Sequence, residues 1–139
     1  MKTILHEGNQ YVLRFDRGDE VLSLLKQYCG QEKITSAFFH GLGACSYLKL
    51  AYYNLETKKY QEQEYNLDLE IAGINGNIAA FENDLIVHMH GTFAGETMKA
   101  IAGHVVSMKT SGTCEIFLTK FDQSMTRKFD PETGLKLLD

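Results

Sequence analysis

The chain has few of the features that would place it outside the cell or in a membrane. Its three cysteines, Cys29, Cys45 and Cys114, are widely spaced and form no Cys-x-x-Cys pair. This usage predicts buried reduced thiols and not a disulfide framework. No run approaches 18 apolar residues, so no transmembrane helix is expected. The first residues turn polar too soon for a signal peptide. We therefore expect a cytoplasmic protein.

Basic residues and proline are also scarce. The chain has 14 lysines and arginines against 18 acidic residues, a formal charge of −4. Broad DNA binding needs a basic face that neutralises several phosphates, so this balance disfavours it without excluding a small basic patch. With one proline and 12 glycines, the bends depend mostly on glycine. The 139 residues contain no linker, low-complexity segment or repeat, which indicates a single domain.

Short strand signals dominate the sequence. One clear helix is predicted over residues 21–29, where apolar residues recur at helical spacing and Gly30 can end it; a weaker short helix is expected near 31–35. Bends are expected at 41–43 and 74–78. The strand signals cover residues 11–15, 37–40, 47–55, a segment after the turn at 57–59, 67–71, 85–90, 101–108 and 114–121. The pattern predicts an α/β (α+β) fold in which one or two helices pack on a mainly antiparallel sheet.

Three histidines carry the chemical signal. His88 and His90 lie in an apolar strand, and their spacing puts both on one face, about 7 Å apart along the strand. The opposite face is apolar and suits either a core or a subunit interface: Leu85, Val87 and Met89. His104 begins the next strand signal and comes within reach if the two strands pair antiparallel. Three neutral imidazoles would leave a tetrahedral zinc one open position for water or substrate. Alternatively, the histidines hydrogen-bond one another, the backbone or water in a cleft. His6 and His40 have no such partners in the sequence and are expected to be ordinary.

Three charged residues are candidates for catalysis. Glu70 lies on the polar face of its strand, and Glu115 follows Cys114 in an apolar strand. Beside a zinc ion, either could act as a fourth ligand, a general base or an orienting partner of a histidine; the alternative is a solvated or ion-paired surface residue. Arg14 is a candidate anchor for an anionic substrate, or else a structural ion pair with an acid such as Glu20.

The order and spacing of several short motifs resemble the PPC (plants-and-prokaryotes-conserved) domain over roughly residues 8–122 of this single domain. The motifs are Arg14 with Gly18 and Glu20, Gly41-Leu42-Gly43-Ala44, Leu69-Glu70-Ile71 followed by Gly76-Asn77-Ile78, His88-Met89-His90, Gly103-His104, and Thr113-Cys114-Glu115-Ile116. The resemblance implies a mainly antiparallel α/β fold, a homotrimer, and a zinc site at His88, His90 and His104. The fold superfamily also includes acetolactate decarboxylases and a zinc-dependent ester hydrolase, which is an analogy of fold only.

The same resemblance carries a DNA-binding label. Plant members contact DNA through an appended AT-hook with an Arg-Gly-Arg-Pro core, which this sequence lacks. They also use a Gly-Arg-Phe-Glu-Ile-Leu stretch for partner contacts, of which only Glu70 and Ile71 are kept here. Two functions therefore remain open. One is a zinc-binding protein that acts as a small-molecule hydrolase, lyase or ligand sensor; the other is a non-catalytic DNA-associated or trimeric scaffold module.

Overall fold

The computed structural model describes residues 1–139. It contains nine strands and a single α-helix, where the sequence predicted one or two. No helix in the chain has the length and hydropathy needed to cross a membrane. The elements are β1 (Lys2–Glu7), β2 (Gln10–Asp16), α1 (Val21–Gln31), β3 (Ala37–Asn54), β4 (Lys59–Tyr65), β5 (Leu69–Phe81), β6 (Asp84–Ala94), β7 (Ala100–Lys120), β8 (Arg127–Asp130) and β9 (Leu135–Leu138).

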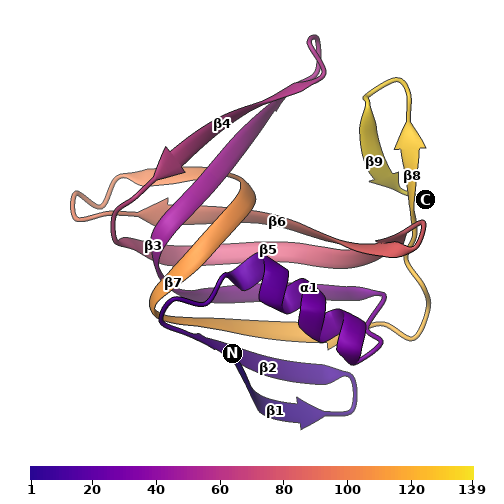
Figure 1. Ribbon diagram of the computed structural model, residues 1–139, viewed down its shortest axis with the longest axis horizontal. Helices are drawn as coiled ribbons and strands as arrows, with labels where there is room; N and C mark the ends of the chain where they lie inside the picture. Colours follow the sequence, from indigo (N-terminus) through magenta and orange to yellow (C-terminus); the bar gives the residue numbers. More distant parts are fainter.

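Seven of the strands form one antiparallel sheet in the order β1-β2-β7-β6-β5-β3-β4. Strand β3 also pairs with β7 along most of its length, so β3, β5, β6 and β7 form a closed ring of strands. In Figure 1, β3 and β7 cross the molecule as long bent ribbons, and α1 lies over the sheet near β7. The mainly antiparallel architecture predicted from the sequence is confirmed.

Helix α1 begins and ends close to the predicted positions. Glu20 is its N-cap, and the side-chain oxygen of Glu20 accepts a hydrogen bond from the backbone N–H of Ser23 at 2.7 Å. The helix buries Val21, Leu25 and Cys29 against the sheet. It continues through Gly30 to Gln31, and no second helix follows before β3.

The core joins the helix to the seven-stranded sheet. It is a single cluster of 23 buried residues, whose largest members are Phe15, Phe39 and Phe93. The three cysteines are buried in this cluster with free thiols, as predicted. Burial raises the pKa of each of these thiols to about 12, which keeps them protonated and unreactive.

Two of the long strands differ from the segments expected from the sequence. Strand β7 runs without a break where two strands were predicted, and β5 passes straight through the bend expected at 74–78. The register shift between β5 and its neighbour β6 lies instead at Ile71/Gly73. The bend at 41–43 is an irregularity within β3, where the pairing with β5 shifts register between Gly41 and Gly43. Position 43 requires glycine, because its φ is +145° and a Cβ there would overlap the carbonyl oxygen of Thr113.

The C-terminal hairpin β8–β9 is an addition that the strand pattern did not indicate. It forms a separate two-stranded sheet beside the end of β5. The backbone N–H of Ala80 donates to the carbonyl of Met125 at 3.0 Å, and Ala80 and Thr126 form a parallel bridge. The hairpin thereby stands across the ends of β5 and β6, opposite the β3–β4 hairpin (Figure 1).

Candidate metal centre

Strands β6 and β7 bring three imidazole rings together. His90 pairs directly with His104 across the two antiparallel strands, as predicted, and His88 lies two residues before His90 on the same face. The ring centroids are 5.0 Å apart for His88–His90, 5.3 Å for His88–His104 and 5.4 Å for His90–His104. One ligating nitrogen from each ring lies within 4.8 Å of the others.

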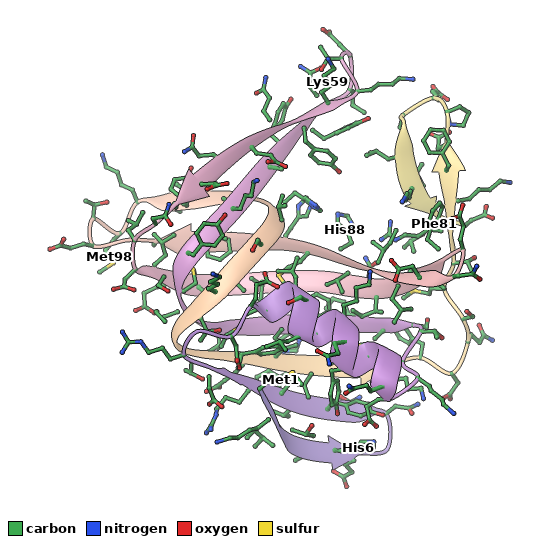
Figure 2. The ribbon with its side chains drawn as sticks, in the orientation of Figure 1. Met1, His6, Lys59, Phe81, His88 and Met98 are labelled. Carbon is green, nitrogen blue, oxygen red and sulfur yellow. The ribbon has the colours of Figure 1, made fainter.

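The alternation of β6 explains why these rings face away from the core. Met89, between the two histidines, is fully buried. Leu85 and Val87 on the same face as Met89 are partly buried and pack against the core. This apolar face therefore belongs to the core of the single chain, and the histidine face is turned outward. Figure 2 shows His88 in the space between the β3–β4 and β8–β9 hairpins.

The spacing of the donor atoms fits a shared metal ion. The Nε2 atoms of His88 and His90 are 3.2 Å apart. Two nitrogens that each lie about 2.0–2.1 Å from a tetrahedral zinc are about 3.3 Å from each other. The same distance fits a hydrogen bond between one protonated and one unprotonated Nε2. This geometry is thus compatible with both alternatives raised from the sequence, a zinc site and a hydrogen bond between the histidines. The set of three nitrogen donors suits zinc.

The electrostatic surroundings keep two of the rings neutral. Burial, with added repulsion from His104, Arg127 and His90, lowers the pKa of His88 from 6.5 to about 4. Burial also lowers the pKa of His104, helped by repulsion from His90. A neutral imidazole has a free lone pair and is the form that binds metal ions. His88 and His104 are therefore in the protonation state that metal binding requires at neutral pH.

Two further residues contact the histidine group. Arg127, the first residue of β8, has its Nη2 3.4 Å from Nδ1 of His88. The same Nη2 donates to Oδ1 of Asn77 at 2.7 Å, and Asn77 is the β5 partner of His88. Because a guanidinium has only donors, the contact with His88 is a hydrogen bond only when the His88 proton is on Nε2. A His88 that ligates a metal through Nε2 carries its proton on Nδ1 instead.

A pocket of about 330 Å³ opens beside the histidines. His88, His104 and Arg127 line it, and Tyr60 of β4 closes one side with its ring centroid 5.5 Å from that of His104. The rest of the lining is Ile86, Val87, Gly134, Leu135, Lys136 and Leu137. Half of the pocket lining thus comes from the C-terminal hairpin, which makes a small ligand-sized cavity next to the three histidines.

Neither carboxylate considered from the sequence belongs to the histidine group. Glu70 is exposed and pairs with Ala94, the last residue of β6. Glu115 lies opposite Arg14 in the register of strands β2 and β7, on a part of β7 away from His104. The group of candidate ligands consists of the three histidines alone.

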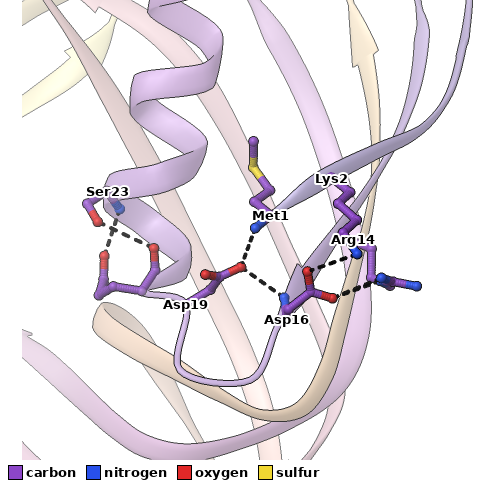
Figure 3. Close-up of polar contacts among 7 residues, drawn as sticks. Met1, Lys2, Arg14, Asp16, Asp19 and Ser23 are labelled. Atoms are coloured by element: carbon purple, nitrogen blue, oxygen red, sulfur yellow. Dashed lines mark hydrogen bonds and ion pairs between the residues drawn. The ribbon is translucent and has the colours of Figure 1, made fainter.

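Arg14 forms an ion pair on the surface near the N-terminus (Figure 3). Its Nε and Nη2 each lie 3.0 Å from Oδ1 of Asp16, the acid two residues along the same strand. The ion pair considered with Glu20 does not form, because Glu20 caps α1 and also accepts from the Ser107 hydroxyl at 3.0 Å. Arg14 is therefore held away from the pocket.

The other two histidines are placed as expected. His6 stacks on Tyr11 at a centroid distance of 4.1 Å, and His40 stacks on Phe117 at 5.4 Å. Neither lies in the candidate metal group.

Sequence reasoning missed Asn77, Arg127 and Tyr60. In the sequence, Asn77 stood in an expected bend and in the motif Gly76-Asn77-Ile78, but neither gave it a role. Arg127 follows the last strand that the pattern indicated. Arg127 also lies outside the region that matches a known protein family. Residues 3–122 match the family described as the Plants and Prokaryotes Conserved (PCC) domain. The chain belongs to the PCC domain family. The resemblance found in the motif order is confirmed, and the hairpin that completes the pocket lies beyond the matched region.

Several solved structures share the fold of this chain. A proposed DNA-binding protein from Ralstonia eutropha JMP134 is 31% identical, with a TM-score of 0.91 over 97% of this chain and 94% of that chain. A metal-containing protein from Archaeoglobus fulgidus is 26% identical, with a TM-score of 0.88 over 99% of each chain. α-Acetolactate decarboxylase from Bacillus subtilis strain 168 shares the fold at 12% identity, with a TM-score of 0.59 over 92% of this chain and 59% of that enzyme. No curated protein sequence matches the chain.

Proposed function

We propose that this PCC domain binds a divalent metal ion, zinc in the first instance, through His88, His90 and His104. The observation that carries the proposal is the convergence of three outward-facing imidazoles from two paired strands. The similar protein from Archaeoglobus fulgidus is described as metal-containing, which supports the same reading. A zinc ion held by three histidines supplies a Lewis acid with an open coordination position.

The residues around the histidines suit a small molecule. The pocket has the size of a small ligand site and combines apolar walls with a few polar groups. Arg127 and Tyr60 would orient the ligand, while the apolar side chains of β6 and β9 would exclude water from it. Within this proposal the protein is a cytoplasmic small-molecule hydrolase or lyase, or a ligand sensor. Glu70, Glu115 and Arg14 lie outside the pocket lining and have no assigned part in it.

Self-association as a homotrimer is part of the proposal. The outer face of β3 and β7 exposes Phe38, Leu42 and Phe117, which are 44%, 51% and 39% exposed. Exposed apolar side chains gathered on one sheet face favour a protein partner. Light scattering coupled to size-exclusion chromatography should give three times the mass of one chain. A Leu42→Glu variant should shift that mass to the monomer.

Metal analysis of tag-free protein tests the metal site. After zinc loading and removal of free metal, the wild-type protein should retain about one zinc per chain. A His88→Ala/His90→Ala variant should retain less than about 0.2 equivalents. His6→Ala is the matched control, because His6 is an exposed histidine outside both the group and the apolar face of β3 and β7. Equal zinc in the wild-type and double-variant proteins would refute the site.

A DNA-associated role is the second candidate, favoured by the description of the Ralstonia relative. The net charge of −4 opposes it. The test is a gel-shift titration with an AT-rich duplex over a range of salt concentrations. A DNA-binding protein should bind at about 50 mM salt and weaken steeply as salt rises, whereas no binding at the lowest salt would remove this role.

A further inference from the structure

The positive charge of Arg127 has no acidic partner. Its Nη1 donates to the carbonyl oxygen of Lys136 at 2.6 Å, and its Nη2 donates to Oδ1 of Asn77 at 2.7 Å. Both acceptors are neutral. None of the ion pairs in the structure includes Arg127, and its Nε–H is buried without any partner. The guanidinium is therefore held firmly in place, but its charge is not neutralised.

The lining of the pocket makes the unneutralised guanidinium of Arg127 energetically unfavourable when no ligand is bound. No aspartate or glutamate lines the pocket, and half of the lining is apolar. The other cation of the lining, Lys136, has its Nζ 4.1 Å from the centre of the Phe81 ring. A partly buried charge loses hydration, and an anion that reaches the outer nitrogens of the guanidinium would neutralise it.

We propose that Arg127 binds the carboxylate of a small organic acid whose apolar part fills the pocket beside His88 and His104. This inference rests on the proposed function in that it names the ligand class of the same site. The protons of Nη1 and Nη2 that are not engaged by Lys136 and Asn77 donate to the carboxylate oxygens. The apolar part of the ligand lies against Ile86, which shares the face of His88, and against Leu135.

Size and charge favour a monocarboxylate over a phosphate ester or nucleic acid. Arg127 is the one cation of this pocket of about 330 Å³ that is not placed over an aromatic ring, in a chain with a net charge of −4. A phosphate ester carries close to two negative charges and would need a second cation. A carboxylate carries one charge and matches the planar fork of a single arginine.

Asn77 provides a way to separate anion binding from a structural role of Arg127. The amide of Asn77 holds the guanidinium without neutralising it. Replacing Asn77 by aspartate puts a carboxylate at the same position, so that the chain supplies its own counter-ion. The link between β5 and β8 is then kept or strengthened, while the ligand loses its charged partner.

The experiment uses metal-free full-length protein, 3-methylbutanoate as the carboxylate probe, and 3-methylbutanamide as its neutral counterpart. Nuclear magnetic resonance titration follows the Nε–H signal of Arg127. We expect saturable binding of 3-methylbutanoate that shifts this signal, with the amide at least about tenfold weaker. Arg127→Gln and Asn77→Asp should each weaken carboxylate binding about tenfold or more, and Lys128→Gln, which removes an exposed charge from the same strand, should leave it unchanged.

The outcomes separate this inference from the proposed metal site. Equal affinity for the acid and the amide, or carboxylate binding that survives Asn77→Asp, would overturn the inference whether or not zinc binds. Carboxylate binding that depends on Arg127 in a protein that retains no zinc would uphold the inference while the metal proposal fails. If Arg127→Gln does not fold, Asn77→Asp decides the question alone, since its structural link is preserved.

Discussion

The two arginines in strands β2 and β8 have opposite electrostatic surroundings. Near the N-terminus, Arg14 and Lys2 both pair with Asp16, and the α-amino group of Met1 pairs with Asp19 (Figure 3). Beside the histidines, Arg127 has only neutral acceptors. The N-terminal charges are balanced within the chain. The charge of Arg127 is left for something outside the chain.

Burial sharpens this contrast between the Arg14 and Arg127 regions. The side chains of Arg14 and Asp16 are 39% and 43% exposed, so water screens their attraction. At the histidine site, burial lowers the pKa values of His88, His104 and Arg127. A change of one charge should therefore change the free energy of unfolding little in the Arg14 region and more in the Arg127 region.

The largest effect is expected from the packing beneath the histidines. Gly76 of β5 faces Met89, and a Cβ there would overlap the ring of Phe39 and the carbonyl oxygen of His88. Gly76→Ala should lower the free energy of unfolding by about 3 kcal/mol, measured by urea denaturation. The control Gly73→Ala lies on the same strand with no atom within 4 Å of its added Cβ. Equal losses in the two variants would show that this packing is not tight.

Zinc should stabilise the protein through the histidines, and Arg14 should not contribute to this stabilisation. Zinc at about 100 times its dissociation constant should add about 2.7 kcal/mol to the free energy of unfolding. His104→Ala should abolish this gain, while Arg14→Gln should preserve it. Thermal unfolding with and without zinc measures the effect. A gain that disappears in Arg14→Gln would contradict the separation of the two regions.

Acid should destabilise the metal-free protein through His88. The unfolded chain takes up this proton near pH 6.5, whereas the low pKa of His88 delays uptake in the folded protein to about pH 4. The unfolded state therefore binds more protons in this range, and the free energy of unfolding falls as the pH drops from 6.5 to 4. With allowance for solvent on its open side, the loss should be about 1–2 kcal/mol. His88→Gln should flatten the profile, and an unchanged slope in that variant would assign the effect elsewhere.

Local sequence patterns were sufficient to predict the three-histidine cluster. A strand turns every second residue to the same face, so His88 and His90 had to share one. An apolar opposite face identified which side would be buried. His104 needed one further assumption, antiparallel pairing with the preceding strand, and the observed register confirms it.

The long-range parts of the fold were beyond these patterns. Periodicity within a window does not show that residues 101–108 and 114–121 belong to one bent strand, because the bend depends on pairing with β3. Arg127 lies 39 residues from His88 in sequence. Its contact depends on the placement of the C-terminal hairpin over β5, which no local signal specifies. A free arginine can be recognised only after every acid has been assigned a partner in space.

The smallest effect is expected at the Arg14–Asp16 pair, and it tests the balanced half of the comparison. Arg14→Gln, Asp16→Asn and the double variant form a double-mutant cycle. We expect a coupling free energy of about 0.2–1 kcal/mol that shrinks as salt is added, because the pair is solvent-exposed. Urea denaturation at low and high salt measures it. A coupling free energy well above 1 kcal/mol that does not change with salt would mean that the N-terminal charges are screened as poorly as Arg127. Exposure would then not explain why one arginine is structural and the other is free to bind a ligand.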